Sequence, residues 1–393
     1  MKKFTKAGYA AAAAFAATSL IATVAGAATQ GSGAKGDIDL AVPAGASLTV
    51  GGSSFSAPLY SYFVNASSAG AYKPTTSVTF GTDSAAGSGD GRTGVTNGNY
   101  EIGFSDQPMD PIAGTVPSTI TASDIASYTQ IPFALGGAVV GYHLASVTKP
   151  LNLSASVLVQ IYNGKITNWS DAQIAALNKG VTLPSETIKV AYRSASSGTT
   201  YAFTDYLAKA TQGRTPSGAS GNVMEGSGKA WGATNVLAES NNAAMATELA
   251  GTEGAIGYLE YSYVLANPGK ITAANLQDAA GVFIAPSLTN IAAAATAYTK
   301  TLSASSFSIT YGSLGKTAVW PLATYTWAIV KTAQTNANNG ELAVKFLDYA
   351  TQGGQKFANA NGFVALPATV QKADHAALLK VKSGTTVLLS LKK

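Results

Sequence analysis

Short apolar runs alternate with helical repeats through most of the chain. Residues 188–192 form an apolar run typical of a strand. A polar turn follows, and then apolar residues recur at the i, i+3, i+4 and i+7 spacing of one helix face, at Phe203, Tyr206, Leu207 and Ala210. This pattern predicts a strand, a polar turn and a helix in that order.

The same order occurs nearer the N-terminus. Residues 47–50 are predicted as a strand and residues 58–63 as the start of a helix, with a glycine- and serine-rich turn between them. Further strands are predicted around residues 78–80 and 100–104, on either side of a glycine-rich turn at residues 87–91. Such alternation indicates an α/β fold with mainly parallel sheets, whose binding sites lie beyond the carboxyl ends of strands.

The turns that open these helices carry the candidate chemistry. Residues 193–200 read RSASSGTT, so that a cation, several hydroxyls and a glycine stand at the start of one helix. A helix N-terminus presents free N–H groups to an anion, Gly198 lets that anion approach the backbone, and Arg193 can add a bidentate clamp. A capping serine and a helix-opening glycine are also ordinary features of helix starts. Three such turns favour a ligand with many acceptor oxygens.

Asp106 follows the strand predicted at residues 100–104 and bears on the identity of that ligand. An ionised carboxylate only accepts hydrogen bonds, so it can bind the hydroxyl of protonated phosphate but repels fully deprotonated sulfate. Asp106 therefore favours phosphate. The alternative is a plain turn-forming aspartate.

Composition narrows the classes of protein. The 393 residues are 46% apolar, enough for the cores of two domains, and only 11% are charged. Without the three lysines of the first six residues, the formal charge of +5 falls to +2, too small for a nucleic-acid surface. The absence of cysteine excludes disulfides, thiolate metal sites and a lipid-modified cysteine. With His143 and His375 as the only histidines, we expect no metal site and no cofactor.

The N-terminus is predicted to be a signal peptide. Three lysines precede an apolar stretch at residues 7–24, and Ala25-Gly26-Ala27 provides a cleavage site after residue 27. A membrane anchor is the alternative, although the stretch is rich in Ala, Thr and Gly. Residues 28–45 are expected to form a flexible lead-in.

Six motifs in this order resemble one family, the periplasmic phosphate-binding protein of the phosphate-specific ABC transporter. The resemblance covers about residues 48–367. The motifs are GSSFSAPLY at 52–60, GFSD at 103–106, GGAVVGY at 136–142, IYNGKITNW at 161–169, RSASSGTT at 193–200 and GAIGYLEY at 254–261.

The resemblance implies a two-lobed periplasmic-binding-protein fold of type II, with the ligand between the lobes. Lobe 1 would be discontinuous, comprising residues 46–133 and 290–393, and lobe 2 would comprise residues 134–289. The hinges would lie near residues 131–135 and 283–288.

The resemblance also implies phosphate ligands, namely Ser54, Phe55, Ser88, Asp106, Arg193, Ser197, Gly198 and Thr199. Ser84 is the alternative to Ser88. One position departs from the family pattern: Ala195 stands where many members have an aspartate that pairs with the arginine. Its loss leaves Arg193 less restrained and the site more positive.

These features predict an exported, monomeric solute-binding protein, periplasmic or secreted. It would capture inorganic phosphate and deliver it to the permease subunits of an ABC transporter in the inner membrane. One alternative is a secreted or cell-surface protein that scavenges phosphate, or acts in adhesion, without a transporter. A phosphatase is the other, but the sequence has no cysteine, no histidine near Arg193 and no Gly-Xaa-Ser-Xaa-Gly elbow around these turns.

Overall fold

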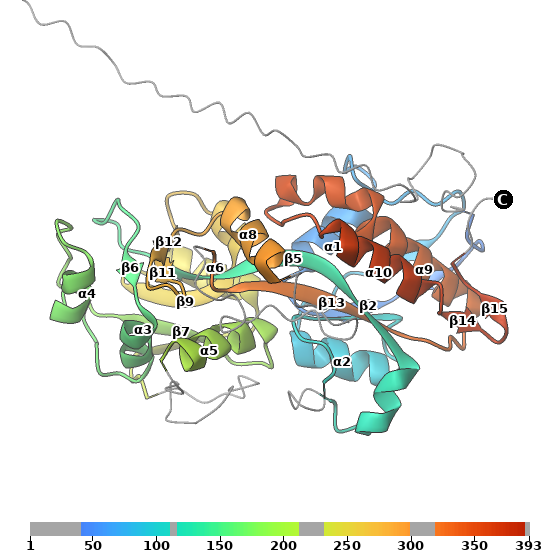
Figure 1. Ribbon diagram of the computed structural model, residues 1–393, viewed down its shortest axis with the longest axis horizontal. Helices are drawn as coiled ribbons and strands as arrows, with labels where there is room; N and C mark the ends of the chain where they lie inside the picture. Colours follow the sequence, from blue (N-terminus) through green and yellow to red (C-terminus); the bar gives the residue numbers. More distant parts are fainter. Residues whose placement is uncertain (1–40, 111–115, 212–231, 299–318, 390–393) are drawn as a thin grey trace, which may run out of the picture.

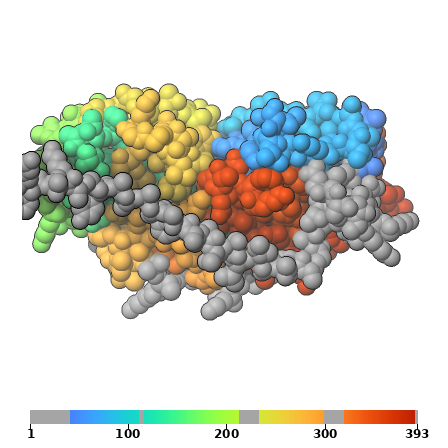
Figure 2. All heavy atoms as spheres, turned by 90° about the horizontal axis from the view of Figure 1, so that it is seen from above, coloured from blue at the N-terminus to red at the C-terminus, as the bar shows by residue number. Residues whose placement is uncertain are grey.

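The computed structural model describes residues 41–110, 116–211, 232–298 and 319–389. The predicted signal peptide and most of the lead-in lie outside these residues. Figure 1 shows an elongated molecule, with the two ends of the described chain gathered at one end of the long axis and its middle at the other. Figure 2 also shows the beginning and end of the described chain, in blue and red, at one end of the molecule and its middle, in green to orange, at the other. We call the elements before residue 110 and after residue 319 the terminal half, and those between residues 150 and 285 the middle half.

One eight-stranded sheet runs through both halves. Its order is β2 (Val50–Gly52), β4 (Ile102–Ser105), β13 (Ala323–Lys331), β5 (Tyr128–Tyr142), β9 (Ala255–Glu260), β7 (Lys189–Arg193) and β8 (Val236–Glu239), and β10 (Thr272–Ala273) pairs with β5 outside this path. Residues 128–137 of β5 pair with β13, and residues 138–142 pair with β9. This long strand therefore connects the two halves.

The sheet is mixed rather than purely parallel. The pairs β2–β4, β9–β7 and β7–β8 are parallel, as the alternation of strands and helices predicts. The central pairs β4–β13, β13–β5 and β5–β9 are antiparallel. The sequence pattern misses this arrangement because β5 and β13 pair across nearly 200 residues, with no local signal for their direction.

Helices cover both faces of the sheet. In Figure 1, α2 (Ser88–Asn97) lies on one side of the strands of the terminal half, and α1 (Ala57–Val64), α9 (Ala337–Thr351) and α10 (Ala368–Leu378) lie on the other. The middle half contains α3 (Ala155–Tyr162), α4 (Ala172–Leu177), α5 (Gly198–Ala210), α6 (Asn242–Gly251) and α7 (Tyr261–Leu265), and α8 (Leu288–Tyr298) packs against β5 and β13. Because both faces are covered, successive residues of the interior strands β5 and β13 are buried, rather than every second one.

Short elements complete the described fold. They are the paired strands β1 (Ser47–Leu48) and β3 (Thr79–Phe80), the sheet of β6 (Asn152–Leu153), β11 (Asn275–Gln277) and β12 (Phe283–Ile284), the hairpin of β14 (Lys382–Ser383) and β15 (Thr386–Val387), and the 3-10 turns Ala122–Ser127, Gly353–Phe357 and Asn359–Asn361. The strands predicted around residues 47–50, 78–80, 100–104 and 188–192 are all present, as are the two predicted helices, α1 and α5.

Aromatic side chains fill the core of each half. In the terminal half, Phe104 and Phe133 pack with ring centroids 4.7 Å apart. In the middle half, Phe203 of α5 stacks on Tyr258 of β9 at 4.7 Å. Tyr258 carries its hydroxyl from this core toward the end of β7, where it meets the backbone of Arg193. The core therefore fixes the position of a predicted site residue.

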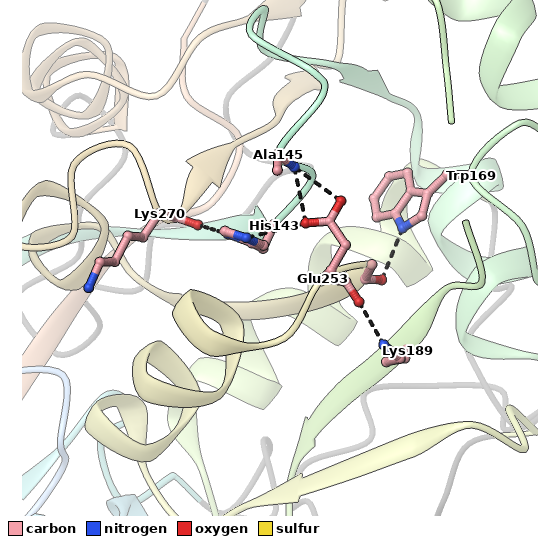
Figure 3. A network of polar contacts seen from close by, with 7 residues as sticks. His143, Ala145, Trp169, Lys189, Glu253 and Lys270 are labelled. Carbon is pink, nitrogen blue, oxygen red and sulfur yellow. Dashed lines mark hydrogen bonds and ion pairs between the residues drawn. The ribbon is translucent and has the colours of Figure 1, made fainter. Parts of the chain in front are cut away.

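His143 lies at the far end of β5, in the polar network drawn in Figure 3. Its Nδ1 contacts the Lys270 carbonyl, and its Nε2 lies 3.3 Å from the Glu253 carboxylate, which also accepts hydrogen bonds from Ala145 N–H. Lys189 donates to the Glu253 carbonyl at 2.8 Å. The histidine thus ties the end of β5 to the turn before β9. Within the described residues, no helix is long and apolar enough to cross a membrane.

Candidate functional site

Asp106, directly after β4, is the centre of a buried polar cluster. Ser53 and Thr326 donate hydrogen bonds to its Oδ1, the latter at 2.9 Å, and Thr199 donates to Oδ2 at 3.4 Å. Burial raises the pKa of the Asp106 carboxyl, while these hydroxyls and the charge of Arg193 act in the opposite direction. The three hydroxyls therefore supply hydrogen-bond donors to the buried Asp106 carboxylate.

Ser88 connects this carboxylate to the middle half. The Ser88 hydroxyl oxygen accepts one hydrogen bond from Asp106 N–H at 3.0 Å and another from Gly198 N–H at 3.1 Å. The alternative residue, Ser84, has a different partner and accepts from Gly52 N–H at 3.1 Å. The structure therefore brings Ser88, and not Ser84, into the cluster around Asp106.

Gly198 begins α5 where that helix meets the terminal half. A Cβ atom at Gly198 would stand 2.4 Å from Asp106 Cβ and 2.6 Å from Ser88 Oγ, distances that no side chain can adopt. The preceding residue, Ser197, caps the helix by accepting from Thr200 N–H at 3.2 Å. Glycine is therefore required at 198 for the close approach of the two halves.

Arg193 ends β7 and is fully buried. Its Nε and Nη2 atoms donate to the Ser240 carbonyl at 3.2 and 2.9 Å, and its backbone N–H donates to the Tyr258 hydroxyl at 3.1 Å. Ala195 stands at the position of the family aspartate, and its methyl side chain cannot pair with the Arg193 guanidinium. The neutral Ser240 carbonyl thus orients the guanidinium without cancelling its charge, and so leaves that charge available to an anion.

Ser54 joins the cluster from the turn after β2. Its hydroxyl accepts from Asn242 N–H at 3.1 Å, and its carbonyl accepts from the Tyr263 hydroxyl at 2.9 Å. Phe55 N–H, which the resemblance directs toward the anion, donates here to Ser53 Oγ at 3.0 Å. All eight predicted ligands therefore lie in one connected group between the terminal and middle halves.

Comparison with known proteins places this chain in a family. A domain model of the PBP superfamily matches residues 22–353. A phosphate-binding protein PstS from Haemophilus influenzae is 30% identical over 326 residues, which are 82% of this chain and 90% of that protein. A PstS from Xylella fastidiosa strain 9a5c is 30% identical over 287 residues, 73% of this chain and 74% of its own. The chain belongs to the PstS family of phosphate-binding proteins.

Solved structures confirm the fold of this PstS family member. The periplasmic phosphate-binding protein PfluDING, solved with phosphate bound, matches with a TM-score of 0.62 at 18% identity and covers 87% of this chain and 96% of its own. The phosphate-binding protein from Stenotrophomonas maltophilia matches with a TM-score of 0.61 at 21% identity, covering 85% and 94%. The predicted α/β periplasmic-binding-protein fold is thus confirmed, with mixed sheets.

The sequence of this family member did not reveal every residue of the cluster. Ser53, Thr326, Ser240 and Asn242 all contact predicted ligands. Ser240 lies in the polar turn between β8 and α6, and Asn242 is the first residue of α6, so the strand, polar turn and helix order of the other turns was an available signal. Thr326 lies 220 residues from Asp106 and has no such signal.

Proposed function

We propose that this protein captures inorganic phosphate between its two halves and delivers it to an ABC transporter. The observation that carries the proposal is the buried Arg193 guanidinium, held by a neutral carbonyl beside the N-termini of α2, α5 and α6. A buried cation needs a counter-charge, and helix N-termini favour an anion with several acceptor oxygens. The PstS relatives support phosphate as that anion.

Six of the eight predicted ligands then have a stated role. The Ser54 and Ser88 oxygens already accept backbone N–H groups, so each hydroxyl keeps its proton to donate to a phosphate oxygen. Arg193 offers charge, and Gly198 and Thr199 offer the start of α5. Asp106 accepts a hydrogen bond from the hydroxyl of the bound phosphate and thereby rejects sulfate. In this proposal Ser88, rather than Ser84, is the ligand.

Capture requires the halves to separate and close. We propose that they correspond to the lobes of residues 46–133 with 290–393 and of residues 134–289, with hinges near 131–135 and 283–288. At the cluster, hydrogen bonds from Gly198, Thr199, Asn242 and Tyr263 cross between them. The bound phosphate would stabilise this closed arrangement, which the permease subunits would recognise.

Export and delivery complete the proposal. The protein would lose its signal peptide after Ala27 and act as a monomer in the periplasm or after secretion. Genes for a permease and an ATPase beside its own would favour delivery over scavenging without a transporter. A phosphatase receives no support from the cluster, because His143 is engaged with Glu253 and Lys270, and His375 with Asp348.

A titration tests the phosphate proposal. We expect the mature chain, stripped of bound phosphate, to bind one phosphate per molecule by isothermal calorimetry and to give no heat with sulfate at the same pH. Binding of both anions would contradict the role of Asp106. Binding of neither would contradict phosphate capture itself.

Gly198→Ala tests the close approach of the halves. The added methyl group would force Asp106 and Ser88 away from α5, and overpacking of this kind costs about 1–3 kcal/mol. We expect phosphate affinity to fall about tenfold, since about 1.4 kcal/mol corresponds to a factor of ten, and the phosphate-bound molecule to be less compact by small-angle X-ray scattering.

The matched control is Gly251→Ala at the last residue of α6, where an added Cβ meets nothing within 4 Å. This variant should keep the affinity and the compaction of the wild type. Equal affinities in both variants would contradict the proposed closure at Gly198.

A further inference from the structure

The polar side chain of Asn242 is buried and makes no hydrogen bond within the part of the chain that the structure describes. It is the first residue of α6 and has no exposed surface. Neither Nδ2 nor Oδ1 has a hydrogen-bond partner among the residues that the structure describes. A buried amide without partners loses its hydration without compensation, so a native protein that keeps one needs a reason for it.

The surroundings of Asn242 supply that reason. Its backbone N–H donates to the Ser54 hydroxyl at 3.1 Å, across the boundary between the halves. Two residues earlier, the Ser240 carbonyl holds the Arg193 guanidinium. The start of α6 is therefore enclosed between two proposed phosphate ligands that come from different halves.

The helix itself favours an anion at this place. The ten residues of α6 direct the positive end of their dipole toward Ser54, and Asn241, the N-cap, uses its own side chain to accept from Ala244 N–H at 2.9 Å. Because Asn241 already caps the helix, the Asn242 amide is not needed for that purpose. The Nδ2 donor and the Oδ1 acceptor of Asn242 are therefore available to a ligand.

We propose that the Asn242 side chain is a further ligand of the bound anion. Its Nδ2 would donate a hydrogen bond to an anionic oxygen of phosphate. This inference rests on the proposed function and adds a residue to its site. Unlike a serine or threonine hydroxyl, the amide accepts and donates through different atoms. Its Oδ1 can therefore accept a hydrogen bond from a second phosphate hydroxyl when the anion is singly charged, while Asp106 accepts from the first.

Two substitutions test the inference by calorimetry with inorganic phosphate. We expect Asn242→Ala to raise the Kd about tenfold to a hundredfold, the range for losing one hydrogen bond to a charged group. Asn242→Asp keeps the shape of the side chain but replaces the donor with an acceptor. It should bind phosphate more weakly at pH 8 than at pH 6, relative to wild type at each pH, because phosphate carries more negative charge at pH 8 and has fewer protons to donate to the carboxylate.

Asn241→Ala is the matched control, since it weakens the start of α6 without removing the proposed ligand. It should lower the melting temperature and leave the Kd nearly unchanged. If Asn242→Ala and Asn242→Asp bind phosphate as the wild type does, the inference is wrong while phosphate capture stands. If the wild type itself binds no phosphate, the proposed function fails and the inference fails with it.

A phosphate-bound crystal structure of the wild-type chain tests the same contact without any variant. Asn242 Nδ2 should lie within hydrogen-bond distance of a phosphate oxygen, about 2.7–3.2 Å. A phosphate bound beside Arg193 with its oxygens out of reach of Asn242 would overturn the inference.

Discussion

Arg193→Ala is expected to remove almost all phosphate binding. The guanidinium is fully buried and its hydrogen bonds go to the neutral Ser240 carbonyl, so its charge is compensated by Asp106 and by the bound anion. Removing one partner of a buried charge pair costs about 3–5 kcal/mol. Since about 1.4 kcal/mol corresponds to a factor of ten, the Kd measured by calorimetry should rise at least a hundredfold.

Arg193→Lys separates charge from geometry. Lysine keeps the positive charge but cannot donate two parallel hydrogen bonds to the Ser240 carbonyl. We expect its affinity to lie between those of the wild type and Arg193→Ala. Thermal unfolding of each variant should confirm that the protein is folded. A folded Arg193→Ala protein that binds phosphate as tightly as the wild type would refute the central role of this residue.

The local parts of the site were predictable because each uses a short-range signal. Ser197 caps α5 and Gly198 follows it, as the Ser-Gly order before the Phe203 repeat predicts. Asp106 lies directly after β4, at the carboxyl end of a strand where sites of α/β sheets are found. Capping, helical periodicity and strand ends are properties of a few neighbouring residues, so they are present in the sequence before any tertiary contact forms.

Contacts between distant segments were not predictable in this way. Thr326 reaches Asp106 because β13 lies between β4 and β5, and that pairing is set by the packing of the whole sheet. The direction of β13 and β5 was missed for the same reason. An apolar strand covered on both faces has no alternation to indicate which neighbours it has or which way they run.

Adjacent residues of one type pose a different difficulty. Ser53 and Ser54 are chemically identical, yet the first donates to Asp106 and the second accepts from Asn242. Their division of roles depends on the backbone path after β2, which composition does not encode. Asn242 was missed although its turn has the same order of strand, polar residues and helix as the others, because nothing local links it to Arg193 or Ser54.

Asp106→Asn is expected to abolish the rejection of sulfate. The carboxylate accepts from Ser53, Thr326 and Thr199, and a sulfate oxygen placed beside it would meet a negative charge with no proton between them. The asparagine amide brings an N–H donor that sulfate can accept from, and it removes the repulsion. Because a like-charge contact costs several kcal/mol, the sulfate Kd should fall at least about a hundredfold, from undetectable heat to a measurable isotherm.

The same substitution should weaken phosphate less than it strengthens sulfate, because phosphate loses one acceptor but keeps Arg193 and the serine hydroxyls. Asp171→Asn is the matched control: Asp171 is the N-cap of α4 in the middle half, its carboxylate accepts from Gln173 N–H at 2.8 Å, and asparagine caps a helix equally well. That variant should still reject sulfate. If Asp106→Asn rejects sulfate as strictly as the control, selectivity resides in the shape and charge of the donor cluster and not in the carboxylate.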